Sequence, residues 1–323
     1  SANVASIYNS GTPTTITGSV AHWKLGEQAT FTDNWLVNNS ALSNYSTRSF
    51  NFDGVDDYVD CGDSDTFSFG NGSTDSPFTF SAWVKLDSLS SNNTIVSKDN
   101  GFTVREYTLF VLTTGKLRIF IKNQGSTNQQ SIDSTTALST GQWYHIGCTY
   151  NGVGGNNAAD GLTLYVNGSA ETPTNVIKNA YIAMSNTIAP FRIGKYSTGN
   201  LMAGSVDEVA VFNSELTSEN VTAIYNSGTP SSISSLSPIS HWRMGEDATF
   251  STNWSLPDNG SASNTGTSAN MTIADLEGDA PNYTGGGLSA NMTIEDRIGE
   301  APNSTSNALS YNMTESDRET DTP

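Results

Sequence analysis

The residue whose type and position most clearly suggest a chemical role is an aspartate inside an apolar strand pattern. Asp207 alternates with Val209 and Val211 in residues 206–212, so on a strand the three side chains share one face. If the valines face the core, the carboxylate also points inward. A buried carboxylate must be ion-paired, hydrogen-bonded or bound to a metal. The simpler alternative is that Asp207 accepts hydrogen bonds from backbone amides at a turn.

The sequence carries no recognisable catalytic pattern. Glycoside hydrolysis needs a pair of carboxylates across the scissile bond, and residues 19–230 contain no Glu-x-Asp-x-x-Glu. The nearest match, in residues 315–319, lies in a C-terminal repeat that already explains its Asp317. No Ser-His-Asp, metal-histidine or phosphate-loop pattern stands out. We therefore predict that the protein is not an enzyme.

Other polar side chains have structural explanations. His22 and His241 occupy equivalent positions of a repeat, and His145 lies in a strand pattern. The acidic cluster in residues 56–65 is best explained by turn aspartates that bind nearby backbone amides.

Two aromatic residues could stack on sugar rings. Trp83 and Tyr165 lie opposite the apolar faces of their expected strands, which is where an exposed ring could contact a sugar. The alternative is that the second face of the sheet is covered too.

The elements that must position these residues are short strands. Apolar residues alternate with polar ones in residues 78–86, 117–122 and 162–166, and a Gly/Asn-rich turn fills residues 151–157. This pattern predicts an all-β, antiparallel two-sheet sandwich.

A repeat defines the domain organisation. Residues 1–13 recur at 218–230, an offset of 218 − 1 = 217, and His22-Trp23-Lys24-Leu25-Gly26-Glu27 returns as His241-Trp242-Arg243-Met244-Gly245-Glu246. We therefore predict the end of a preceding unit at 1–18 and one complete sandwich at 19–230. Residues 231–266 would begin a partial following unit.

Short helices are expected at the ends of the units. Thr217 or Ser218 can cap a helix whose apolar face carries Val221, Ile224 and Tyr225. Gly228 and Pro230 would then end it.

The C-terminal residues 267–323 repeat with a period of 21. Asn-Met-Thr starts at residues 270, 291 and 312, and each Thr is followed three residues later by Asp, which fits a capping box. Helices of about two turns are unstable alone. We therefore expect residues 238–323 to dock on a neighbouring copy or another protein; the alternative is that they fold back on their own sandwich.

Composition excludes several classes of function. The formal net charge is −18, which repels nucleic acid and attracts cations. No apolar run reaches the roughly 20 residues that span a membrane. Cys61 and Cys148 lie in strand patterns and are expected to be buried free thiols. Ser1 leaves open whether the start is processed or trimmed.

Five sequence motifs, which follow one another along the chain, resemble those of the laminin G-like jelly rolls of the concanavalin A-like lectin and glucanase superfamily. They are Phe-Asp-Gly-Val-Asp-Asp-Tyr-Val (52–59), Phe-Ser-Ala-Trp-Val-Lys (80–85), Gly-Gln-Trp-Tyr-His-Ile (141–146), Leu-Tyr-Val-Asn-Gly (164–168) and Val-Asp-Glu-Val-Ala-Val-Phe (206–212). The resemblance implies a jelly-roll sandwich and a binding role. The tandem units and the methionine-bearing tail look most like virion or fibre proteins of marine bacteriophages.

The resemblance also implies a site and partners. Related jelly rolls often hold a structural Ca²⁺ at an aspartate like Asp207 and an early loop, which here is Asp53-Gly54. The expected partners are other virion or surface proteins and further copies of the chain. The alternative function is a carbohydrate-binding adhesin on a cell surface or outside the cell.

Overall fold

The computed structural model describes residues 29–31, 35–37, 46–277 and 287–288, with gaps at 102–103, 125–127, 198 and 247. The chain divides into two compact units. One is Ser46–Asn282, and the other combines Ser1–Tyr45 with Tyr283–Pro323.

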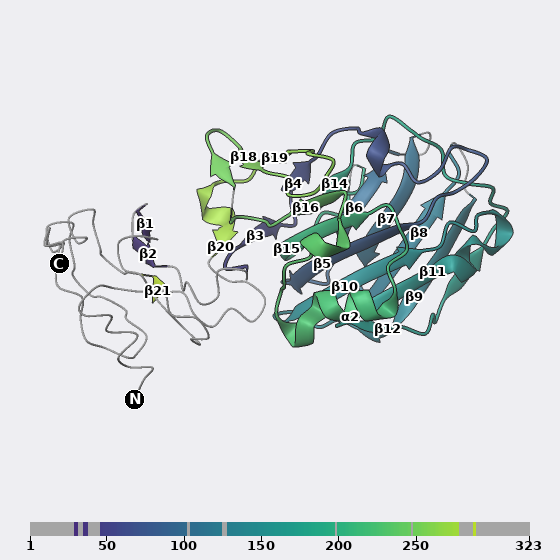
Figure 1. Cartoon of the computed structure of the whole chain (residues 1–323), viewed down its shortest axis with the longest axis horizontal. Helices are drawn as coiled ribbons and strands as arrows, with labels where there is room; N and C mark the ends of the chain where they lie inside the picture. The colour runs from purple at the N-terminus through teal and green to yellow at the C-terminus, as the bar shows by residue number, and fades with distance from the viewer. Residues whose placement is uncertain are drawn as a thin grey trace, which may run out of the picture. The chain divides into compact units, whose positions relative to one another are not determined.

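The large unit is a sandwich of two antiparallel sheets (Figure 1). The eight-stranded sheet runs in the order β12 (Ser169–Ala170), β11 (Leu162–Val166), β10 (Trp143–Tyr150), β5 (Phe78–Leu86), β15 (Ala203–Phe212), β3 (Ser49–Asp53) and β20 (Leu276–Glu277). Its eighth strand, β16 (Ser240–Trp242), also pairs with β15. The ten-stranded sheet runs β13 (Val176–Lys178), β9 (Gln129–Ala137), β8 (Lys116–Lys122), β7 (Arg105–Val111), β6 (Asn93–Asp99), β14 (Arg192–Ile193), β4 (Tyr58–Asp60), β19 (Gly266–Ala269), β18 (Trp254–Leu256) and β17 (Thr249–Phe250). The predicted fold class is confirmed.

Alternation along the strands builds the core. Phe78, Phe80 and Val84 of β5 face Tyr107 and Leu109 of β7 in one buried apolar cluster. The rings of Phe80 and Tyr107 lie 4.9 Å apart. Each strand therefore contributes every second side chain to the space between the sheets.

One helix covers the outer side of the eight-stranded sheet. Helix α2 (Ser218–Tyr225) begins at Thr217, whose side chain accepts a hydrogen bond from the Asn220 amide. Val221 and Ile224 are buried, and the Tyr225 ring stacks on Trp83 at 5.8 Å. The predicted helix, its cap and its apolar face are confirmed. No helix among the described residues is long and apolar enough to span a membrane.

The segment after the helix belongs to the same sandwich. Strand β16 pairs with β15, and β19 pairs with β4. The prediction that residues 238 onward dock elsewhere is therefore wrong for residues 240–277. The sandwich extends past its predicted end at 230, because strand edges of β15 and β4 supply the backbone hydrogen bonds that the isolated segment lacks.

The first tail repeat folds as a single turn and a strand. Thr272 and Asp275 form the predicted capping box around the 3₁₀ turn Ile273–Asp275. The expected two turns of helix are absent there, because Leu276 and Glu277 pair with β3 instead. The other two repeats, apart from residues 287–288, lie outside the described residues, as do residues 1–18.

The small unit contains a three-stranded antiparallel sheet. Its order is β1 (Ala29–Phe31), β2 (Trp35–Val37) and β21 (Gly287–Leu288).

Both cysteines are free and buried, as the sequence predicts. Burial raises the pKa of the Cys61 and Cys148 thiols, and a protonated thiol is a poor nucleophile. We expect an alkylating reagent to label neither thiol in the native chain and both after denaturation, as measured by intact mass. Rapid labelling without denaturant would contradict this burial.

Candidate functional site

Three carboxylates form a buried cluster on the outer side of the eight-stranded sheet, where Asp207 lies opposite Trp83. The expectation that Asp207 points into the core with Val209 and Val211 is wrong, because a register shift separates them and only the valines enter the core cluster. Oxygen atoms of Asp207, Glu208 and Glu246 all lie within 4.8 Å of one another. Asp207 and Glu208 come from β15, where the pairing with β5 shifts register between Asp207 and Ala210, and Glu208 has a φ of 48°. This bulge allows two consecutive acidic side chains to reach the same cluster.

The cluster is held from several directions. One oxygen of Glu246 accepts hydrogen bonds from the Thr47 amide and, at 2.8 Å, from the Arg48 amide. Glu208 contacts His241 Nε2 at 2.6 Å and Arg243 Nε at 3.3 Å. These contacts join β16 and the residues that follow it to β15 and to the residues just before β3.

Two carboxylate oxygens of the cluster accept no hydrogen bond from a described residue. Oδ2 of Asp207 and Oε2 of Glu246 are buried without a hydrogen-bond partner among the described residues. Burial, and next the neighbouring Glu208 and Glu246, raise the pKa of Asp207 well above its usual range. Burial also raises the pKa of Glu246 to about 7. Such oxygens must be protonated or bound to a cation, and Ca²⁺ prefers carboxylate ligands of this kind.

The predicted partners of Asp207 lie elsewhere. Asp53 pairs with Ala203, four residues before Asp207 on β15, and its carboxylate accepts hydrogen bonds from the Val55 and Asp56 amides. Gly54, at φ +76°, lets the turn pass the Ala203 side chain, which an added Cβ would approach to 2.8 Å. Asp53, Gly54 and Asp207 therefore form no single ligand set.

Sequence reasoning missed Glu208 and Glu246. The signal for Glu246 was its place in the repeated phrase, since Glu27 holds the same position in the first copy. Glu208 was hidden because strict alternation would turn it away from Asp207; only the bulge brings them together. Calcium at this cluster stays a prediction.

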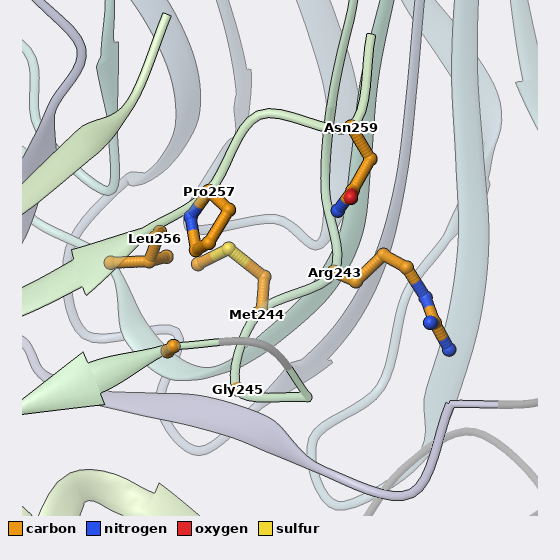
Figure 2. A pocket seen from close by; sticks show the side chains of 7 residues that line it. Arg243, Met244, Gly245, Leu256, Pro257 and Asn259 are labelled. Carbon is orange, nitrogen blue, oxygen red and sulfur yellow. The ribbon is translucent and has the colours of Figure 1, made fainter. Parts of the chain in front are cut away.

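Beside the cluster lies a shallow hollow (Figure 2), lined by Arg243, Met244, Gly245, Ala248, Leu256, Pro257 and Asn259. Its volume is at most about 160 Å³, whereas small-molecule sites usually measure roughly 300–1,000 Å³. It is too small to be the binding site of a ligand such as an oligosaccharide.

Trp83 and Tyr165 are not available to sugars. Trp83 is 2% exposed and Tyr165 is 5% exposed. The first lies against Tyr225, and the second packs in a buried cluster with Val221 and Ile224. The predicted stacking role is therefore wrong, because α2 covers this face of the sheet.

The outer face of the ten-stranded sheet is different. On β7 and β8, Leu109 and Ile119 enter the core cluster, while their neighbours Phe110 and Phe120 do not and pair with each other at 5.5 Å. The Lys122 ammonium lies 3.9 Å from the centre of the Phe120 ring. This face therefore combines aromatic and basic side chains.

Basic residues gather there although the chain is acidic. The half-buried Tyr58 has the Lys195 ammonium 3.7 Å from its ring centre and the Arg192 guanidinium 5.7 Å from it. Burial, and next the neighbouring Arg105, lower the pKa of Lys122 to about 8. Among the described residues, no carboxylate forms a salt bridge with Lys195, whereas Lys122 is buried near Asp99 and Arg118 is paired with Asp133. Lys195, which is partly exposed, can therefore attract an anionic group.

A family model matches the sandwich. The model, a laminin G domain of the concanavalin A-like lectin/glucanases superfamily, aligns with residues 53–222. The aligned region covers 170 of the 323 residues. The chain belongs to this superfamily. A search of curated proteins found no match.

Several solved structures are similar to the chain at low identity. A Bacteroides ovatus protein, provisionally named carbohydrate binding, is 19% identical with a TM-score of 0.49 and covers 73% of this chain; the chain spans 61% of its length. The CBM40 module of a Ruminococcus gnavus IT-sialidase, bound to α2,3 sialyllactose, is 12% identical with a TM-score of 0.42. That match covers 56% of this chain and 99% of the module. A Limulus polyphemus pentraxin is 17% identical with a TM-score of 0.35, over 54% of this chain and 83% of its own.

Proposed function

We propose that the chain is a non-catalytic, lectin-like module that binds glycans on the outer face of its ten-stranded sheet. The observation that carries the proposal is the partly exposed Lys195 ammonium beside the Tyr58 ring, on an outer sheet face that α2 does not cover. Glycans with carboxylate or sulfate groups suit this face, because ammonium groups without a carboxylate partner bind anions strongly.

Catalysis is not part of the proposal. A glycosidase needs carboxylates that reach the scissile bond of a bound sugar. Asp207 is fully buried and Glu208 is 8% exposed, so their cluster is inaccessible to a polysaccharide. A binding module of this kind would serve attachment on a virion or, alternatively, on a cell surface, the two locations that the sequence predicts.

Titration with acidic and neutral oligosaccharides tests the site. We expect the wild-type chain to bind an acidic oligosaccharide more tightly than its neutral counterpart. Lys195→Gln should weaken binding about tenfold, since one charge-assisted contact contributes about 1.5–3 kcal/mol.

The matched control is Lys178→Gln. Lys178 lies on β13 of the same sheet, but its ammonium is already paired with Asp160 at 2.5 Å. Its loss should leave the affinity unchanged. Equal affinities for the wild type and the Lys195→Gln variant would contradict the proposed site.

A further inference from the structure

We propose that copies of this chain join by exchanging the segment that closes the sandwich. One slot, formed by the edges of β15, β4 and β3, holds residues 240–277. The chain carries a second version of the strands that fill it, in residues 21–37 and in the second tail repeat. Each chain therefore has one slot and two segments that fit it, and the surplus segment can close the slot of a second copy.

The contacts that hold residues 240–277 in the slot depend on particular side chains. His241 binds Glu208, and the Trp242 ring stacks on Phe191 at 5.5 Å. Gly245 has a φ of +119°, and an added Cβ would lie 2.6 Å from the Leu276 side chain. Glu246 accepts the amide hydrogens at the start of β3. A replacement segment must therefore carry these four residue types at the same spacing.

The first copy meets this requirement. The matching residues are His22, Trp23, Gly26 and Glu27, and the two positions between them keep a basic and an apolar residue, Lys24 and Leu25. Residues 22–35 and 241–254 share nine of 14 residues. The glycine is kept at the position where the segment in the slot has a φ of +119°, which favours glycine.

The two hairpins have the same register. Phe31 pairs with Trp35 in the small unit, and Phe250 pairs with Trp254 in the sandwich. Both residues of the second pair lie 219 positions after those of the first, since 250 − 31 = 254 − 35 = 219.

The third strand also corresponds. Val37 pairs with Gly287, as Leu256 pairs with Gly266. The shift from Gly266 to Gly287 is 21 residues, the period of the tail repeat. The sheet β1-β2-β21 thus repeats β17-β18-β19 strand for strand.

The two sheets differ at one edge. Strand β19 continues to β4 of the sandwich, whereas among the described strands β21 pairs only with β2. An unpaired strand edge is a template for another strand. The β4 edge of a second copy fits it, because that edge already accepts the matching strand. Exchange keeps the His, Trp, Gly and Glu residue types and the register of the paired strands, so it costs little free energy.

Disulfide trapping between differently tagged chains tests the exchange. Val211 pairs with Ser240, and Ala21 is the residue that corresponds to Ser240, since 240 − 219 = 21. One chain would carry Val211→Cys and the other Ala21→Cys, and the mixture would be oxidised. We expect a covalent dimer that carries both tags.

Two controls make the result decisive. A single chain with Val211→Cys and Ser240→Cys should form the bond internally, which shows that the variant folds. Adding Trp242→Ala to the Val211→Cys chain should raise the yield of the mixed dimer several-fold, and adding Trp23→Ala to the other chain should abolish it. Formation of the internal bond without any mixed dimer would overturn the proposal.

Discussion

Trp242→Ala is expected to lower the free energy of unfolding of the sandwich by about 3–5 kcal/mol, the range for truncation of a large buried aromatic residue. The background should carry Trp23→Ala, so that the first copy of the phrase cannot substitute. Trp242 is fully buried, stacks on Phe191, and donates a hydrogen bond from its indole to the Asn264 carbonyl at 2.9 Å. Its removal leaves a cavity and an unpaired carbonyl.

Chemical denaturation measures this effect. The matched control is Phe250→Ala in the same background, because Phe250 belongs to the same segment and is 36% exposed. We expect it to cost less than about 1 kcal/mol. If the segment were detached from the sandwich in solution, Trp242→Ala would change the midpoint no more than Phe250→Ala does.

Stability is expected to fall as pH rises from 5 to 8 in the presence of a chelator. The pKa of Glu246 is about 7 in the folded chain, against an ordinary 4.5, because it is buried. Between these values the folded chain keeps a proton that the unfolded chain has released. The stabilising contribution is therefore complete below the lower value and lost by the higher one, up to about 3 kcal/mol. The raised pKa of Asp57, about 6 through burial, acts in the same direction.

Glu246→Gln should flatten this dependence. The amide oxygen can still accept the hydrogen bonds of the Thr47 and Arg48 amides, but the side chain no longer titrates. Thermal melts at pH 5 and pH 8 measure the difference. A wild-type chain whose melting temperature is as high at pH 8 as at pH 5 would contradict the buried protonated cluster.

Calcium gives the same cluster a second test. If Ca²⁺ binds Asp207 and its neighbours, it replaces the protons there, so it should raise the melting temperature more at pH 8 than at pH 5. Asp207→Asn should remove the rise. An unchanged melting temperature at both pH values would rule out the predicted metal.

Much of the fold could be predicted from local pattern. Alternation in residues 78–86 and 117–122 predicted the strands, because burying one face of a sheet requires period two. The cap at Thr217 and the apolar face of α2 followed from residue types at fixed spacing. The buried free thiols and the capping box at Thr272 were local features in the same sense.

The sequence by itself determined the sandwich, the helix and the existence of a repeated phrase, because each depends on neighbours in the chain. Only the tertiary structure decided what those elements contact. It showed that α2 covers Trp83 and Tyr165, that a bulge brings Glu208 beside Asp207, and that residues 240–277 close the sandwich instead of leaving it. Pairing partners more than a hundred residues apart in the chain, such as Val59 and Ser268, leave no local pattern. Their selection depends on which strand edges remain open after the rest of the chain has folded.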